Sequence, residues 1–208
     1  MSKKDAFKAL LESSISNDTP HFEAVGRFIS SFASAEAAAH ALARKLSGLT
    51  DKKARVIFGG MRLGDITDRM RGMMLADVVA EKIYTDINSC LTQLNFIADQ
   101  RHKLVHRSAM YFANKLIVSN LMTAKSVENA ELNVFSTTDL SAMDSDCFII
   151  YLRLHRHADD DLVQVNEVAI QHLLTLPWQY KHEKPKSQNK QRQKVPGSQK
   201  RQRGASQE

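Results

Sequence analysis

Long hydrophobic runs are missing from this sequence. A helix that crosses a bilayer needs about 18 or more consecutive apolar residues, and no such run occurs. The N-terminus, from Met1 to Ala6, carries charges and leads into an amphipathic segment, unlike the uninterrupted apolar core of a secretory signal. These features argue against a membrane-spanning protein, and we expect a cytoplasmic protein with no membrane contact.

Cysteine and glycine are also scarce. The two cysteines, Cys90 and Cys147, lack the spacing of a metal site, and both fall on apolar faces of expected helices. Buried thiols of this kind are typical of reducing compartments. The 8 glycines form no glycine-rich phosphate loop. The sequence therefore predicts no metal centre and no cofactor.

Net charge is almost absent from most of the chain and is concentrated at its end. Residues 1–180 hold 20 basic and 21 acidic side chains, whereas residues 181–208 hold nine Lys and Arg against two Glu. The end is rich in Gln, Lys and Arg and has Val195 as its only sizeable apolar side chain, so we expect a disordered basic tail.

Binding to RNA is the natural function of such a tail, because each Lys or Arg that meets a phosphate releases a counterion. A solvated terminus without a partner is the alternative. The candidate RNA-binding residues of the tail are Lys190, Arg192, Lys194, Lys200, Arg201 and Arg203.

Apolar residues recur at helical spacing through most of the remaining sequence. Thr19 can cap a helix that has Pro20 in its first turn, so residues 16–20 are expected to end one helix and start the next. The segment before this break is expected to be a short amphipathic helix, and the one after it a long core helix. The expected helices are 1–18, 19–47, 50–58, 62–73 and about 75–107, the last continuing to about Tyr111.

Two β-leaning runs interrupt the helical pattern. Leu116–Val118 and Leu132–Phe135 flank a polar stretch, which predicts a β-hairpin at about residues 115–136. Ser136 to Asp139 has the spacing of a capping box and should open another helix. A last helix is expected from about residue 159 to Pro177.

The second long helix carries an apolar stripe that ends on an arginine. The stripe advances by three or four residues at each step, as the buried face of a helix does, through Val79, Ile83, Ile87, Cys90, Leu94 and Ile97. The next step is Arg101. Burying an unpaired charge costs roughly several kcal/mol, so this guanidinium needs a partner, and a bound phosphate would be one.

The segment Arg101-His102-Lys103-Leu104-Val105-His106 places an arginine, a polar residue and a histidine near the end of this core helix. In this motif the sequence resembles the HEPN superfamily of all-α domains, over about residues 22–157, although only those six residues match at the level of a motif. The resemblance implies an HEPN-like helical bundle, here residues 19–180 with the hairpin inserted. It also implies a metal-independent endoribonuclease of the kind found among toxins and phage-defence effectors, acting as a homodimer whose two motifs face each other.

The chemistry of these side chains supports the same function. RNA cleavage by internal transfer needs a base for the 2′-OH, an acid for the departing 5′-oxygen and a cation for the phosphorane. A histidine titrates near pH 6.5, so His106 could act as base or acid, a role worth about 10² to 10⁴-fold in rate. Arg101 could clamp the phosphate bidentately, and His102 could orient the nucleotide or titrate as a second group. Lys103 and Arg107 flank the motif as candidate RNA contacts.

Helix geometry sets a condition on this site. Positions five residues apart on an ideal helix differ by about 500°, so Arg101 and His106 should point about 140° apart with about 7.5 Å of rise between them. A straight helix does not bring them together. Either the helix loosens before Ser108, or the site is built from both chains of a symmetric dimer. We favour the dimer.

The sequence thus predicts a dimeric ribonuclease that leaves 2′,3′-cyclic phosphate and 5′-OH ends, with RNA and a possible antitoxin or regulatory protein as partners. One alternative is a non-catalytic HEPN-like module that binds RNA or a partner protein through Arg101. Another is a structural helical protein in which Arg101 and His106 only neutralise the helix dipole and cap its last carbonyls. For the basic cluster from Arg153 to His157, capping of a helix end is the favoured explanation.

Overall fold

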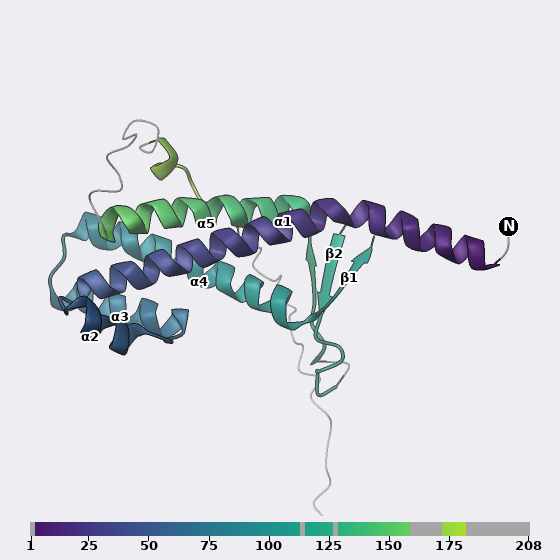
Figure 1. Ribbon diagram of the computed structural model, residues 1–208. Helices are drawn as coiled ribbons and strands as arrows, with labels where there is room; N and C mark the ends of the chain where they lie inside the picture. The colour runs from purple at the N-terminus through teal and green to yellow at the C-terminus, as the bar shows by residue number, and fades with distance from the viewer. Residues whose placement is uncertain (1–2, 113–114, 127–128, 159–171, 182–208) are drawn as a thin grey trace, which may run out of the picture.

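The computed structural model describes residues 3–112, 115–126, 129–158 and 172–181, with only the backbone described for residues 3–18 and Phe112. In Figure 1, α1 (Lys3–Leu46) runs the length of the molecule, and α5 (Thr137–Ala158) and α4 (Glu81–His106) pack beside it. The expected helix over residues 159–176 lies mostly outside the described residues, as does the basic tail after Lys181.

The first helix is continuous where the sequence predicted a break. The expected boundary at residues 16–20 is wrong, because Pro20 lies inside α1. A proline inside a helix removes one backbone hydrogen bond and favours a kink. The sequence on each side of Pro20 keeps helical spacing, so the loss of one hydrogen bond does not end the helix here.

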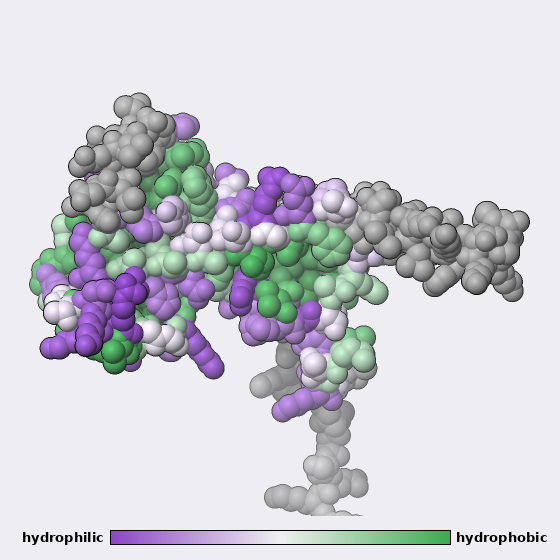
Figure 2. All heavy atoms as spheres, in the orientation of Figure 1, coloured by the Kyte–Doolittle hydropathy of each residue, from purple (hydrophilic) through white to green (hydrophobic). Residues whose placement is uncertain are grey.

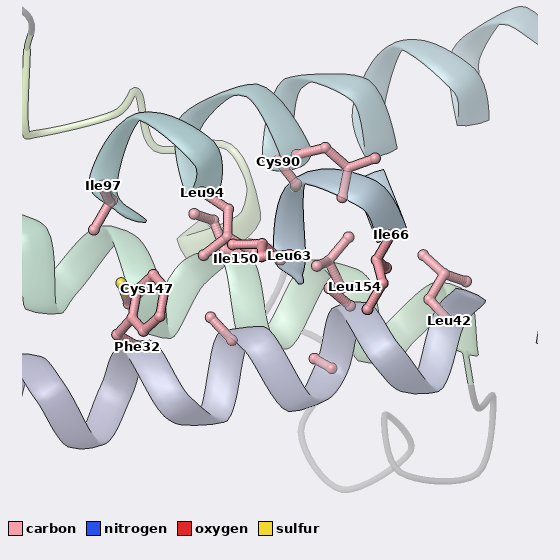
Figure 3. Close-up of a cluster of buried hydrophobic side chains, with 14 of the residues drawn as sticks. Phe32, Leu42, Leu63, Ile66, Cys90, Leu94, Ile97, Cys147, Ile150 and Leu154 are labelled. Atoms are coloured by element: carbon pink, nitrogen blue, oxygen red, sulfur yellow. The ribbon is translucent and has the colours of Figure 1, made fainter. Parts of the chain in front are cut away.

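The long helices form a bundle because each presents one apolar stripe to the others. The predicted stripe of α4 is buried from Ile87 to Ile97, and α1 packs along α5 over most of its C-terminal half. Figure 3 shows Phe32 of α1, Ile97 of α4 and Cys147 of α5 meeting in this core. Cys90 and Cys147 are both free and buried, as expected.

Two short helices, α2 (Asp51–Phe58) and α3 (Leu63–Ala76), cover one end of the bundle close to where the sequence placed them. The start of the next helix was misplaced by about six residues, because α4 begins at Glu81 and not at residue 75. Val78 separates the two helices with φ at 50°. This left-handed conformation stops α3, since a right-handed helix cannot pass through it.

An antiparallel sheet of three strands lies at the opposite end of the molecule, next to the C-terminal end of α4 (Figure 1). Strands β2 (Lys115–Ser119) and β3 (Leu132–Phe135) form the predicted hairpin, with Ile117 opposite Val134. The sequence missed β1 (Ser108–Phe112), which pairs with β2 where helix was expected. The bundle is therefore mostly helical with a small sheet in place of a simple hairpin.

The predicted capping box opens α5. The Asp139 carboxylate accepts hydrogen bonds from the Ser136 backbone N–H at 2.8 Å and from the Ser136 hydroxyl at 2.6 Å. The Asp139 backbone N–H donates to the Ser136 hydroxyl oxygen at 3.1 Å. These bonds satisfy donors that the first turn of a helix leaves without intrahelical partners.

The surface near the sheet is partly apolar. On the face drawn in Figure 2, hydrophobic side chains gather below α1 beside the sheet. Phe22 is 64% exposed, Val105 47% and Met110 63%. Within the described parts of the chain, none of the helices is long and apolar enough to cross a membrane.

Candidate functional site

Arg101 occupies the place on α4 that the apolar stripe predicted. It is the next stripe position after the buried Ile97, it is half-buried, and its Cζ lies 5.8 Å from the ring centroid of Phe32 on α1. This distance is at the outer range of a cation–π contact. Arg101 Nε is buried and has no hydrogen-bond partner among the described residues. The guanidinium therefore keeps hydrogen-bonding capacity that a bound anion could use.

His102 and His106 lie together on the solvent side of the last turns of α4. Both are exposed, and their ring centroids are 4.7 Å apart with an angle of 47° between the planes. Their spacing of four residues places them on one face of the helix. The two imidazole rings are therefore in contact with each other on the helix surface.

One chain does not bring Arg101 and His106 onto the same face. The helix remains intact through His106, and Arg107 follows it in an extended conformation as the C-cap. The loosening before Ser108 that the sequence left open is therefore not present. Arg101 packs on the Phe32 side of α4, whereas the histidine pair is exposed to solvent.

The two basic residues that flank the motif differ in their surroundings. Arg107 Nη1 lies 2.8 Å from Glu131 Oε2, and the Arg107 side chain is only 18% exposed. Arg107 Nη1 has no hydrogen-bond partner in the described structure, so this contact is an ion pair. The charge of Arg107 is thus balanced by Glu131, whereas Lys103 is half-buried in the last turn of α4.

A further histidine lies near the end of α4. His21 of α1 is 5% exposed, and its ring packs edge-on against Tyr111 of β1 with centroids 4.7 Å apart. Its Nε2 atom is buried without a hydrogen-bond partner in the described structure. The contact with Tyr111 gives His21 a packing role between α1 and β1.

A second charged cluster joins α4 to the C-terminal end of α5, and the sequence did not predict it. Arg153 donates to Asp86 Oδ1 through Nε at 2.9 Å and also through Nη2. His157 Nε2 lies 2.8 Å from Asp86 Oδ2. The capping role expected for the cluster is therefore wrong for Arg153 and His157, because both bind a carboxylate on another helix.

The environment of Asp86 sets its protonation. Burial by itself would raise the pKa of Asp86, but hydrogen bonds from His157 and Arg153, together with their charges, outweigh burial and lower that pKa. A cavity of about 1030 Å³ adjoins the cluster. The Asp86 carboxylate already contacts two basic side chains, Arg153 and His157. The cluster therefore holds α4 and α5 together.

Among the described residues, neither the cysteine thiols nor a cluster of metal ligands offers an alternative reactive site. Burial raises the pKa of the Cys90 thiol to about 12 and also raises that of Cys147, so neither is a ready nucleophile. Across the described ranges, no group of three or more His, Cys, Asp or Glu side chains could hold a metal ion. The end of α4 is thus the strongest candidate for a functional site.

Comparison with known proteins gives no match to a protein-family model, to a curated protein or to a solved structure. The family resemblance therefore depends on the six motif residues and on their position at the end of a core helix.

Proposed function

We propose that this protein is a metal-independent endoribonuclease of the HEPN type that works as a homodimer. The observation that carries the proposal is the exposed pair of imidazoles, His102 and His106, with ring centroids 4.7 Å apart at the end of α4. Arg101, one residue before this pair, has a buried Nε without a hydrogen-bond partner among the described residues. Two imidazoles and a guanidinium thus lie at the same end of one helix.

The proposed reaction divides the work among these side chains. One imidazole takes the proton of the 2′-OH as its oxygen attacks the phosphorus, and another donates a proton to the departing 5′-oxygen. A guanidinium binds the non-bridging phosphate oxygens and stabilises the charge that grows on them. The products are a 2′,3′-cyclic phosphate and a 5′-OH.

A second chain supplies the geometry that one chain lacks. Because Arg101 packs towards α1 and His106 is exposed to solvent, we propose that the arginine of one protomer works with the histidines of the other. The exposed apolar side chains Val105, Met110 and Phe22 near this end support association, since such surfaces gain free energy when a partner covers them.

Binding of RNA without cleavage is the second candidate function. It is favoured by one observation, the packing of Arg101 against Phe32 on a different side of α4 from the histidine pair. In that case Arg101 anchors a phosphate and no proton transfer follows.

An RNA cleavage assay in excess EDTA tests the proposal. Wild-type protein should cut RNA, and Arg101→Ala and His106→Ala should each lose most of the activity. Arg69→Ala and His172→Ala are matched controls, because both residues are exposed and distant in sequence from the motif, and both variants should keep wild-type activity. If the wild-type protein leaves the RNA intact, the result favours RNA binding without cleavage. If all five proteins cut RNA equally, Arg101 and His106 take no part in the cleavage.

Mixing the two inactive variants tests the two-chain site. A heterodimer of Arg101→Ala and His106→Ala has one site with both changes and one with neither. Random exchange of protomers makes about half of the dimers mixed, so activity should return to about a quarter of the wild-type value. Variants that stay inactive after verified exchange would show that each protomer needs its own Arg101 and His106.

A further inference from the structure

The three strands place a row of apolar side chains on one face of the sheet. Met110 on β1 lies opposite Ile117 on β2, and Ile117 lies opposite Val134 on β3. Residues directly opposite each other in antiparallel strands project their side chains to the same face. The three side chains therefore form one line across the sheet, which we call the apolar row.

The apolar row lies on the outer face of the sheet. Successive residues of a strand point to opposite faces, and the two neighbours of Ile117, Leu116 and Val118, are both buried. The row itself is accessible, because Met110 is 63% exposed and Val134 is 45% exposed. The inner face thus belongs to the core, and the outer face presents apolar surface to solvent.

Leu132 extends this surface along β3. It precedes Val134 by two residues, so its side chain points to the same face, and it is 67% exposed. Its partner across the sheet is Ser119, an uncharged residue. The apolar surface therefore covers more than the single row.

The sheet carries almost no charge. Lys115, at the first position of β2, is the only charged residue of the three described strands. RNA and anionic lipid surfaces are recognised through several cationic side chains, and this face offers one. It fits a partner whose own contact surface is apolar and uncharged.

A second copy of this chain offers such a surface. In a two-fold interface the same patch lies on both sides of the contact. If the two-fold axis runs along β2 between two stacked sheets, Ile117 faces its own copy and Met110 faces the partner subunit's Val134. Each apolar side chain then meets another one, so the apolar row is complementary to itself.

The sheet is too small to hold two chains together without help. Three strands about 4.8 Å apart and at most five residues long cover roughly 240 Å², whereas a stable interface buries about 800 Å² on each partner. A copy seated on the apolar row must therefore cover adjoining surface as well. The end of α4 adjoins it, because four residues of chain keep Met110 Cα within about 14 Å of His106 Cα, and Val105 there is 47% exposed.

We propose that the outer face of the sheet is the surface through which two copies of this chain pair, with the apolar row at its centre. The inference rests on the proposed function, which needs a second chain, and it names the surface that supplies that chain. Each sheet follows directly from its own α4, since Arg107 alone separates the helix from β1. Pairing through the sheets therefore brings both α4 ends, with Arg101 and the histidine pairs, to one interface.

Sedimentation velocity over a series of protein concentrations tests the interface. Wild-type protein should form a dimer, and Met110→Lys and Val134→Lys should each raise its dissociation constant at least about 30-fold, because each places a charge in the apolar centre of the contact. Val56→Lys is the matched control and should leave the constant unchanged, because Val56 is 80% exposed on α2, at the other end of the molecule (Figure 1). A monomeric wild type, or equal dimerisation of all four proteins, would overturn the proposal.

Cross-linking tests which residues face each other. Stacked sheets pack about 10 Å apart, so Ile117→Cys should be joined to its copy by a short bismaleimide, and Val56→Cys should not. The native cysteines, Cys90 and Cys147, are buried and should not react in the folded protein. A dimer in which Ile117→Cys gives no more cross-link than Val56→Cys would show that the chains pair through another surface.

The cleavage assay separates this inference from the proposed function. Pairing through the apolar row without RNA cleavage would retain the interface and reject the nuclease. Cleavage that needs Arg101 and His106, but is unchanged in Met110→Lys and Val134→Lys along with their dimerisation, would retain the nuclease and reject the interface.

Discussion

Asp86 holds α4 to the end of α5, and its removal should be costly. Its partners are largely withdrawn from water, since the side chains of Arg153 and His157 are 14% and 20% exposed and that of Asp86 is 30% exposed. Removing one partner of a buried ion pair costs about 3–5 kcal/mol, whereas an exposed pair contributes about 0.2–1 kcal/mol. Asp86 lies between these limits, so Asp86→Ala should lower the free energy of unfolding by about 2 kcal/mol.

Urea denaturation at neutral pH measures this change. For a chain of this size, the same loss should lower the melting temperature by about 4–8 °C. Asp68→Ala is the matched control, because Asp68 also pairs with an arginine, Arg71 at 3.2 Å, but its side chain is 80% exposed. The control should lose less than about 1 kcal/mol. A loss for Asp86→Ala no greater than that of Asp68→Ala would refute the argument from burial.

The pH dependence supplies a second check. The pKa of Asp86 is lowered in the folded protein, so its contribution to stability is complete above the ordinary value of 3.8 and is lost as the pH falls through the lower folded value. The difference between wild type and Asp86→Ala should therefore be constant from about pH 7 to about pH 5 and shrink below about pH 4. A difference that grows on acidification would contradict the assigned direction of the shift.

Three further predictions follow from local features. Ser136→Ala removes the hydroxyl that bonds Asp139 and should cost about 1 kcal/mol in urea denaturation; an unchanged midpoint would show that the capping box is not stabilising. Val78→Asn should raise stability by about 1 kcal/mol, because φ at 50° strains a β-branched residue and suits asparagine; a loss would contradict that strain. Cys90 and Cys147 should not react with a thiol reagent at neutral pH until urea unfolds the protein, since burial raises both pKa values, that of Cys90 to about 12; immediate reaction of the folded protein would contradict their burial.

The sequence pattern predicted those features of the structure that depend only on residues close together along the chain. The stripe predicted the buried residues of α4 from Ile87 to Ile97, and Arg101 follows on it against Phe32. At its start the stripe was wrong, because Ile83 is 41% exposed and Val79 lies before the helix begins. The capping box of α5 also formed as predicted, because its donors and acceptors lie within one turn. These features need no information about distant parts of the chain.

The errors arose where a distant partner decided the conformation. The helix was expected to continue to about Tyr111, but β2 offers Ser108–Phe112 backbone hydrogen-bond partners and they form β1. Asp86 and Arg153 are 67 residues apart, and no local pattern shows that they meet. The break expected at Pro20 failed for a different reason, since the loss of one hydrogen bond did not end α1.

The sequence by itself determined which helix faces are apolar, the order of Arg101, His102 and His106 on one helix, and the concentration of basic charge after Lys181. These properties follow from side-chain chemistry and from the 3.6-residue period of the helix. Only the tertiary structure decided which residues from distant parts of the chain meet: Phe32 beside Arg101, Tyr180 beside Phe96, and Asp86 between Arg153 and His157. Such contacts depend on how separate helices pack, which is a property of the whole chain.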